Sequence, residues 1–504
     1  MVLYTRPPRL EALEGDPLSA ARFVVVPVFQ SKGDGEAKPL IEGLAARADE
    51  AVGGALSRAV EAGLFRGSAG ETLTAFTGDG RVVVFAGAGE KGAEPWRLAE
   101  NARASAAAAV KALVEKAGEV ALPASEYGEA ALEAVVGALL GAYRFEAFKS
   151  ERKAKLSRVL ADLPRERLEE ALALAEGVYL ARDIANAPPH EVAPPRLAER
   201  LRDLFSRLDR VEVEVFDYDR LVREGFGGIV NVGRGSDEKP RLIIVRYNGG
   251  EGDPVAIVGK TIVFDSGGIN LKPSHMMFEM RADKAGGAAA AGIAWAAARL
   301  GLPVNLVALI PAAINVPSGS SYLPSDVVRM WDGTYVEVTN TDAEGRLVIA
   351  DAIAYAAKQI GASEIIDLAT LTGAAWIALG PLYAALFTRD DKLARALEEA
   401  SRRTGERLWR LPLVDEYKAM LGKKAPLGDV ANAAMRAGGA ICAALFLERF
   451  AHGKRWAHLD IAGPGIASDA GPMAPKYWPQ GLAPGWGVRL IIDYLRSRGS
   501  GASG

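Results

Sequence analysis

Short apolar runs alternate with longer alanine-rich stretches along the first third of the chain. The runs are rich in Val, Phe and Thr, a composition that favours strands. The stretches between them, of which residues 102–117 are the clearest, have the composition of helices. Strands alternating with helices are typical of an α/β domain, which we place at residues 1–163. The strands are expected at RFVVVPVF (22–29), TLTAF (72–76), RVVVFA (81–86) and EVALP (119–123).

A polar stretch at residues 149–167 separates this region from the rest of the chain. A helix-like segment follows it, and we expect a connecting helix at about 164–186. A second, larger α/β domain should then occupy residues 164–504, with a flexible tail at about 497–504. Length alone suggests about three domains, but the motifs described below support two.

Charged side chains recur at every second position in the octet NTDAEGRL (340–347). On an extended backbone, Asp342, Glu344 and Arg346 would point to one side. Such a group is either solvated or held together by a bound ion. The octet also fits a helix start, because Thr341-x-x-Glu344 has the pattern of a capping box ahead of an apolar run.

A second acidic stretch lies upstream, at residues 255–287. The segments VAIVG and TIVF within it have the composition of buried strands. Four charged residues lie at the ends of these strands and in the turns that follow, where α/β proteins place their sites. They are Lys260, Asp265, Lys272 and Asp283. Asp265 opens a Ser-Gly-Gly turn in which the backbone can approach a ligand closely.

Together the two stretches hold three Asp, one Glu, two Lys and one Arg. Two divalent ions would balance the four carboxylates, and the cations could hold an oxyanion, as a two-metal hydrolytic site requires. Oxygen ligands without a nearby His or Cys suit Mn, Mg, Co or Zn in a hard-donor site better than a structural zinc. The sequence therefore predicts a dinuclear hydrolase, and a phosphoesterase could use the same carboxylates.

Three segments resemble the leucyl aminopeptidase family of dinuclear metallopeptidases, the cytosolic aminopeptidase type. They are GKTIVFDSGGINLKP (259–273), MRADKAGGAAAAG (280–292) and NTDAEGRLVIADAIAYA (340–356). Further matches lie in the family's order, so that the resemblance covers about residues 165–495. These are ARDIANAPPHEVAPPRLAE (181–199), DLATLTGAAWIALG (367–380), AMRAGGAICAALFLERF (434–450) and WAHLDIAGP (456–464).

The resemblance implies a fold and a set of metal ligands. A smaller N-terminal α/β domain would be joined by a helix to a larger catalytic α/β domain with a central mixed sheet. Asp265 and Glu344 would bridge two metal ions, Lys260 and Asp283 would complete one ion, and Asp342 would complete the other. Lys260 would then be a neutral amine, which a neighbouring dication favours. An ordinary Lys-Asp ion pair is the alternative for Lys260.

The resemblance also implies two catalytic groups. Lys272 would polarise the scissile carbonyl and stabilise the gem-diolate. Arg346 would hold a bicarbonate that serves as general base. The alternatives are a solvated loop lysine and a salt bridge from Arg346 to Asp342 or Glu344.

In the family, a metal-bridging hydroxide attacks the peptide carbonyl while one ion binds the free α-amine of the substrate. The expected activity is removal of N-terminal residues from small peptides, with a preference for Leu and other large aliphatic residues. Met280 and Thr370 belong to the implied pocket but could equally be core packing. The whole implied pocket is Met280, Thr370, Gly373 and Ala462. Family members are homohexamers, so we expect a homohexamer here.

Three positions depart from the family pattern without removing a ligand. Thr261 replaces the usual Gly, Lys284 replaces the usual Met after Asp283, and Arg281 replaces the usual Lys. Lys284 adds a positive charge beside a proposed ligand, so it could weaken metal binding or simply point away.

The segment Gly87-Ala-Gly89-Glu-Lys-Gly92 follows a predicted strand and precedes a helical stretch, as in a dinucleotide-binding turn. No second strand with a terminal acidic residue follows about 20 positions later, so a plain Gly-rich turn is the preferred interpretation. A nucleotide-binding protein is kept as an alternative function. GKT at 259–261 is no phosphate-binding loop, because Pro254 stands where that loop requires Gly.

Composition mainly excludes other classes of protein. A hydrophobic content of 49% and a charged content of 24% are those of a soluble globular protein. The net charge of −3 provides no broad basic field, so nucleic acid is an unlikely partner. The apolar run at 286–298 is too short to span a bilayer and the first residues lack a signal-peptide pattern, so we expect a cytoplasmic protein. The single cysteine excludes an intrachain disulfide.

Overall fold

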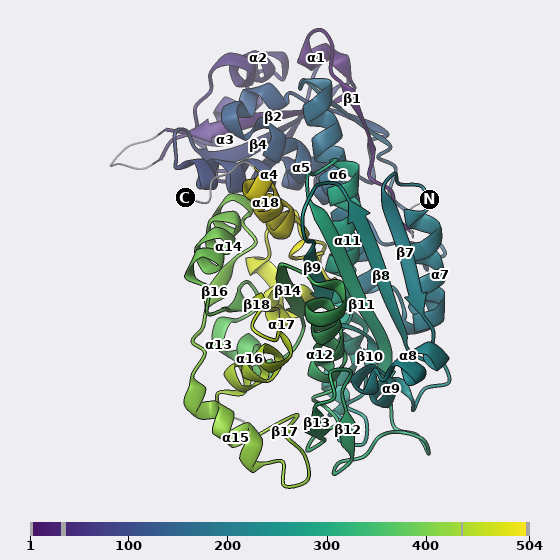
Figure 1. Ribbon diagram of the computed structural model, residues 1–504. Coiled ribbons are helices and arrows are strands. Elements are labelled where there is room, and N and C mark those ends of the chain that lie inside the picture. Colours follow the sequence, from purple (N-terminus) through teal and green to yellow (C-terminus); the bar gives the residue numbers. More distant parts are fainter. Residues whose placement is uncertain (1–3, 32–36, 435–436, 500–504) are drawn as a thin grey trace.

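The protein folds into two α/β domains, one above the other in Figure 1. The computed structural model describes residues 4–31, 37–434 and 437–499. The smaller domain is N-terminal, and the larger one contains the central mixed sheet that the family resemblance implies. Within the described residues, no helix combines the length and apolar character needed to cross a membrane.

The N-terminal domain is built on a six-stranded sheet in the order β1-β6-β5-β2-β4-β3. Only β3 runs antiparallel to its neighbour. All four strands predicted from apolar runs are confirmed, whereas the short strands β1 and β6 were not predicted. The strands are β1 (Arg9–Ala12), β2 (Phe23–Gln30), β3 (Thr72–Phe76), β4 (Val82–Glu90), β5 (Glu119–Leu122) and β6 (Arg158–Ala161). The helices are α1 (Pro17–Ala20), α2 (Gly43–Ala51), α3 (Ala55–Glu61), α4 (Pro95–Leu113) and α5 (Ala131–Gly141).

The Gly-rich segment of this domain is part of a strand. β4 continues to Glu90, so Gly87 and Gly89 lie inside the sheet. Their amide groups donate to the carbonyl oxygens of Glu71 and Gly67, at 2.8 and 3.0 Å. A phosphate would need these same amides, so the structure contradicts a nucleotide-binding turn here. The glycines are required by packing instead, because a Cβ on Gly87 would lie 2.1 Å from the Ser68 carbonyl oxygen.

Helix α6 (Arg165–Asn186) follows β6 and occupies the segment in which we expected the connecting helix. The division between the domains at residue 163 stays a prediction. The predicted tail overlaps the last turn of α18, which ends at Gly499. Residues 500–504 of that tail lie outside the described residues.

The larger domain contains a nine-stranded mixed sheet in the order β16-β15-β18-β14-β9-β11-β8-β7, with β10 paired to β11. A second, three-stranded sheet lies beside it. The strands are β7 (Val211–Phe216), β8 (Arg241–Asn248), β9 (Val255–Gly259), β10 (Thr261–Asp265), β11 (Asn305–Asn315), β12 (Val327–Arg329), β13 (Tyr335–Glu337), β14 (Glu364–Ala369), β15 (Ala384–Phe387), β16 (Leu408–Arg410), β17 (Val430–Ala431) and β18 (Arg455–Asp460).

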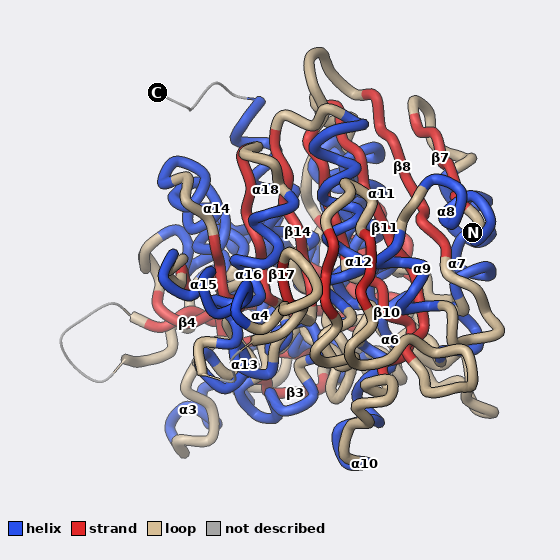
Figure 2. The backbone as a smooth tube through the Cα atoms, turned by 60° about the horizontal axis from the view of Figure 1, so that its bottom comes forward, coloured by secondary structure: helices blue, strands red, loops and turns tan. Residues whose placement is uncertain are grey.

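Helices cover both faces of the large sheet, as Figure 2 shows. Helices α6, α7, α11 and α18 pack on one face and α9, α12 and α16 on the other, and the two apolar cores lie between helices and strands. The helices are α7 (Pro194–Phe205), α8 (Tyr218–Glu224), α9 (Gly227–Gly233), α10 (Ser274–Met277), the 3-10 helix η3 (Phe278–Ala282), α11 (Ala285–Arg299), α12 (Gly345–Tyr355), α13 (Gly373–Leu379), α14 (Asp391–Thr404), α15 (Lys418–Lys423), α16 (Gly439–Phe450), α17 (Ala462–Ile466) and α18 (Val488–Gly499).

The start of α11 lies directly against the ends of β9 and β14. A Cβ on Gly286 would lie 2.0 Å from the Leu368 carbonyl oxygen, and one on Gly259 would lie 2.4 Å from the Gly286 carbonyl oxygen. The Gly287 amide donates to the Lys260 carbonyl oxygen at 2.7 Å. Glycine therefore lets the helix approach the strands closely at this point.

We expect Gly286→Ala to lower the free energy of unfolding by about 1–3 kcal/mol, because the added methyl group forces α11 away from β14. Chemical denaturation would measure the change. Gly118→Ala is the matched control, since a Cβ there meets nothing within 4 Å. Equal stabilities of the two variants would contradict this account of the contact.

Candidate metal centre

The charged residues singled out from the sequence gather at one edge of the large sheet. β9, β10, β14 and β18 are parallel to their paired neighbours β11 or β14, so their carboxyl ends meet there. Lys260 directly follows β9, Asp265 ends β10 and Thr370 directly follows β14. The carboxyl edge of parallel strands is the usual position of a site in such folds.

The octet 340–347 contains the start of a helix, as one of the two interpretations predicted, but neither the extended backbone nor the capping box is formed. Its backbone is not extended, because Glu344 has φ −73° and ψ −38° and directly precedes α12. Nor does Thr341 cap the helix, since its hydroxyl donates to the Gly267 carbonyl oxygen at 2.7 Å and accepts from the Asn270 amide at 2.9 Å. The acidic side chains converge because a turn leads directly into the helix.

Three of the predicted ligands form a compact acidic cluster. Asp265, Asp342 and Glu344 offer carboxylate oxygens that all lie within 4.8 Å of one another. Asp265 and Glu344 are buried, and Asp342 is partly accessible. Carboxylates at such separations repel one another unless cations lie between them.

Two lysines link the acidic side chains. Lys260 Nζ lies 2.8 Å from Asp283 Oδ1 and 3.0 Å from Glu344 Oε1. Lys272 Nζ lies 2.8 Å from Asp265 Oδ2 and 2.5 Å from Asp342 Oδ1. The five predicted ligands and Lys272 therefore form two ion-paired groups, each with one ammonium group and two carboxylates, and the acidic cluster joins the two groups into one network.

Burial and mutual repulsion perturb the protonation of the network. Burial, and then the neighbouring Asp265 carboxylate, raise the pKa of Glu344 to about 8. Burial raises the pKa of Asp283 to about 6, although Lys260 opposes it. Burial alone would lower the pKa of Lys260, but Asp283, Glu344 and Asp265 together raise it above its usual value. A lysine that is protonated here would lose its proton only if another cation took over the balancing charge.

The donor set fits divalent cations. Asp283 Oδ2 and Glu344 Oε2 are buried and have no hydrogen-bond partner among the described residues. A buried carboxylate oxygen without a partner is costly, and a bound cation would remove that cost. The residues that could hold the ions are Lys260, Asp265, Asp283, Asp342 and Glu344.

Arg346 lies in the first turn of α12 and is buried. Its Nη1 donates to the Asn432 carbonyl oxygen at 2.7 Å, and its Nε has no partner within the described part of the chain. No carboxylate of that part lies within 4.0 Å of it, so the salt bridge considered from the sequence is not formed. Burial lowers the pKa of the guanidinium, as expected for a charge without a counter-ion.

The four residues of the implied pocket lie on loops and helix starts beside this network. Thr370 is buried, and its hydroxyl donates to Asp283 Oδ1 at 2.6 Å while its carbonyl oxygen accepts from Lys260 at 2.9 Å. Gly373 begins α13 and Ala462 begins α17, and both are at least partly exposed. Met280 lies in η3 and is partly buried. That these four line one pocket stays a prediction.

The departures from the family pattern do not face the carboxylates. The Thr261 hydroxyl donates to the Gly259 carbonyl oxygen at 2.8 Å and lies against α11. Lys284 is fully buried, and its Nζ donates to the carbonyl oxygens of Val263 and Arg281. Burial lowers the pKa of Lys284 to about 7, so much of its charge is lost near neutral pH. Of the two possibilities considered, the side chain points away from Asp283.

Several residues that support the centre were missed from the sequence. Asn315, at the end of β11, donates to Asp265 Oδ1 at 2.8 Å and to the Thr341 carbonyl oxygen at 3.0 Å. The Asn432 side chain accepts from the Thr339 and Asn340 amides and so holds the segment before Asp342. Asn315 could have been found by its place at a strand end, whereas nothing local distinguishes Asn432.

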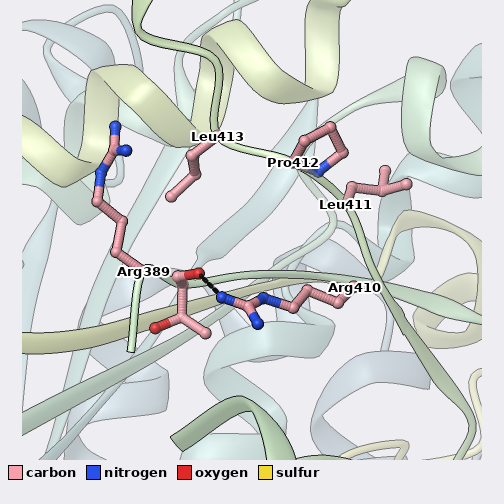
Figure 3. Close-up of a pocket in the computed structure, with 6 residues that line it drawn as sticks. Arg389, Arg410, Leu411, Pro412 and Leu413 are labelled. Atoms are coloured by element: carbon pink, nitrogen blue, oxygen red, sulfur yellow. Dashed lines mark hydrogen bonds between the residues drawn. The ribbon is translucent and has the colours of Figure 1, made fainter. Parts of the chain in front are cut away.

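A cavity of about 500 Å³ lies elsewhere on the domain (Figure 3). Arg389 and Arg410 line it together with Leu411, Pro412 and Leu413. Arg389 pairs with Asp415 and Glu448, and Arg410 pairs with Asp391. Both guanidinium groups are therefore neutralised by the protein itself, and the cavity presents no unpaired charge to a ligand.

Comparisons with known proteins identify the family of both domains. Residues 179–492 match the model of the cytosol aminopeptidase family, catalytic domain, and residues 25–152 match that of its N-terminal domain. A probable cytosol aminopeptidase of Aeropyrum pernix is 56% identical over 99% of this chain and 100% of its own. One from Cenarchaeum symbiosum is 41% identical over 82% and 86%.

Solved structures give the same result. The bottromycin maturation enzyme BotP, also solved in complex with Mn, has a TM-score of 0.82 and 36% identity, covering 95% of this chain and 100% of that one. A mutant of tomato leucine aminopeptidase has a TM-score of 0.82 and 29% identity, covering 98% of each chain. The chain therefore belongs to the cytosol aminopeptidase family of metal-dependent aminopeptidases.

Proposed function

We propose that this protein is a dinuclear aminopeptidase that hydrolyses the N-terminal peptide bond of small peptides and prefers Leu and other large aliphatic first residues. The observation that carries the proposal is the buried network in which Lys260 and Lys272 link four carboxylates at the carboxyl edge of the sheet. A phosphoesterase could use the carboxylates alone, but membership of the aminopeptidase family favours peptides.

Two divalent cations would be held by the five ligands in the arrangement that the family resemblance implies. When bound, they would supply a water of lowered pKa and Lewis-acid polarisation of the carbonyl group. We propose Mn, Zn, Co or Mg, since four ligands are carboxylates. The Mn complex of the related BotP supports Mn as the first ion to test.

Two side chains of this protein would act on the reacting groups. Lys272 carries an ammonium group at the edge of the acidic cluster. There it would stabilise the negative charge that develops on the carbonyl oxygen of the scissile peptide bond when the tetrahedral intermediate forms. Arg346 would hold a bicarbonate, which would supply a proton acceptor for the attacking water. The support is its buried guanidinium, which has one backbone partner and no ion pair among the described residues.

Exopeptidase specificity would come from the same acidic environment. The free α-amino group of a peptide is a cationic or metal-binding group, and the cluster of Asp265, Asp342 and Glu344 would favour it. The first side chain would enter the pocket proposed at Met280, Thr370, Gly373 and Ala462. Acetylation of the N-terminus removes the amine, and with it this anchor.

We propose a cytoplasmic homohexamer, as the family resemblance implies. Large apolar side chains on the described surface support an assembly, among them Phe278 and Ile377, which are 77% and 78% exposed. Phe278 lies in η3, which ends directly before Asp283, and Ile377 lies in α13, which begins three residues after Thr370.

We expect Glu344→Gln to abolish metal-dependent release from a leucine anilide, because the amide cannot bridge two cations. A loss of about 10³-fold or more in kcat/KM is expected from removing such a ligand. Glu406→Gln is the matched control, a buried glutamate that accepts from the Gly487 and Leu490 amides and pairs with Arg489 rather than with the cluster. Cleavage of the N-acetylated anilide by the wild-type protein would contradict an aminopeptidase.

Metal binding should release protons and weaken as the pH falls from 8 to 6. Cations need the charged carboxylates, whereas burial and the neighbouring Asp265 carboxylate raise the pKa of Glu344 and so favour its protonated form before metal binds. Lys260 would also have to lose its proton, which acts in the same direction. Calorimetric titration of the metal-free protein with Mn, in buffers of different ionisation enthalpy, would count the protons. Equal affinity at pH 6 and pH 8 would refute this view of the ligands.

Sedimentation equilibrium should give a mass six times that of the 53.2 kDa chain. Ile377→Glu should lower that mass if α13 lies in a subunit contact, because it would bury an unpaired charge. Glu166→Lys, on the N-terminal turn of α6, is a charge-changing control on a different helix. A monomer mass for the wild-type protein would rule out the hexamer.

A further inference from the structure

Asp460, the last residue of β18, is a buried carboxylate that pairs with no cation among the described residues. Its Oδ1 accepts from the amides of Leu371, Thr372 and Ala462, at 3.1, 3.3 and 3.2 Å. Its Oδ2 accepts from the Thr372 hydroxyl at 2.6 Å. Four donors from two separate loops therefore converge on one side chain.

The two loops held by Asp460 carry most of the proposed pocket. Thr372 caps α13 by accepting from the Ala375 amide at 3.0 Å, so its position fixes where Gly373 begins the helix. Ala462 begins α17 two residues after Asp460. A buried carboxylate is strongly held by amide donors, and its removal would release both loops at once.

The loop that Asp460 binds at Leu371 and Thr372 also contacts the proposed metal ligands, through the preceding residue. Thr370 precedes the two residues bound by Asp460, and it contacts Asp283 through its hydroxyl and Lys260 through its carbonyl oxygen. A displacement of residues 370–372 would therefore move the partners of one half of the centre. Asp265 and Asp342 make none of these contacts and depend on Asn315 and Lys272 instead.

We propose that Asp460 is a positioning residue that sets the shape of the pocket for the first substrate side chain and couples it to the Lys260–Asp283 half of the metal centre. The inference rests on the aminopeptidase function proposed above. Substrate selectivity and the affinity for one of the two ions should accordingly change together when Asp460 is altered.

Asp460→Asn tests the coupling with little change of shape. The amide can still accept from the backbone, but its nitrogen faces the Thr372 hydroxyl as a donor. We expect the ratio of kcat/KM for leucine and alanine anilides to fall about tenfold, a change within the range that pocket fit controls. In a Mn titration of the metal-free protein, one binding step should weaken about 10-fold or more while the other is unchanged, as for other groups that orient metal ligands.

Asp351→Asn is the matched control. Asp351 is also fully buried and accepts from two backbone amides, those of Ile229 and Trp331, at 3.0 and 2.9 Å. It touches none of the pocket loops, so its variant should lose stability but keep the selectivity ratio and both Mn affinities. If Asp460→Asn behaves in the same way, Asp460 is only a structural residue and the proposal is overturned.

A second pair of variants decides the matter if Asp460→Asn does not fold. Thr372→Val removes the hydroxyl that binds Oδ2 with almost no change in volume, and Thr372→Ser keeps it. We expect the valine variant to lower the selectivity ratio and weaken one Mn step, and the serine variant to restore both. Unchanged values in the folded valine variant would overturn the proposal.

The outcomes separate this inference from the function on which it rests. A wild-type protein that releases no anilide with any of the four metals would contradict the proposed function. Equal Mn affinities of the wild-type, Asp460→Asn and Thr372→Val proteins would contradict the positioning role, whatever the anilide assays show.

Discussion

The structure of the larger domain depends on one electrostatic constraint, the burial of four carboxylates at a single edge of a sheet. Burial of even one unpaired carboxylate is costly, and mutual repulsion adds to that cost. Lys260 and Lys272 reduce it by lying between pairs of carboxylates. Asn315 and Thr370 add hydrogen bonds to Asp265 and Asp283. A cluster of this kind is compatible with a stable fold only when cations balance it, which links stability directly to ligand binding.

Close backbone contacts make that arrangement possible. The start of α11 can approach β9 and β14 only because Gly259, Gly286 and Gly287 lack side chains at the points of contact. This approach brings Asp283, just before the helix, against Lys260, just after β9. The apolar cores on the two faces of the sheet then hold the strands rigidly enough to keep the charged side chains in place. The glycines that allow the close packing of α11 thus also place Asp283 beside Lys260.

Local patterns in the sequence predicted some of the strands and site residues of this structure and missed others. Apolar runs predicted four of the six strands of the N-terminal domain and the strands on either side of Lys260, because burial imposes a visible composition. They missed β1 and β6, which have only four residues each. For the octet 340–347 the helix start was predicted correctly, whereas the capping role of Thr341 was not, because hydrogen bonds to Gly267 and Asn270 use its side chain. Motif spacing nevertheless identified every member of the ion-pair network. Asn432 and Asp460 could not be found in this way, since their partners lie far away in the sequence.

The wide sequence separation of these partners has a consequence for the order of synthesis. A nascent chain that ends at Ala369 contains all five proposed ligand positions but lacks Thr370, Asn432 and Asp460. Its acidic side chains would already be present without the residues that hold Asp283, Arg346 and the loop after β14. Contacts of such long range form late, after the intervening chain has been ordered. If the proposed metal centre forms, we therefore expect its assembly to be a late step that waits for the segments containing Thr370, Asn432 and Asp460.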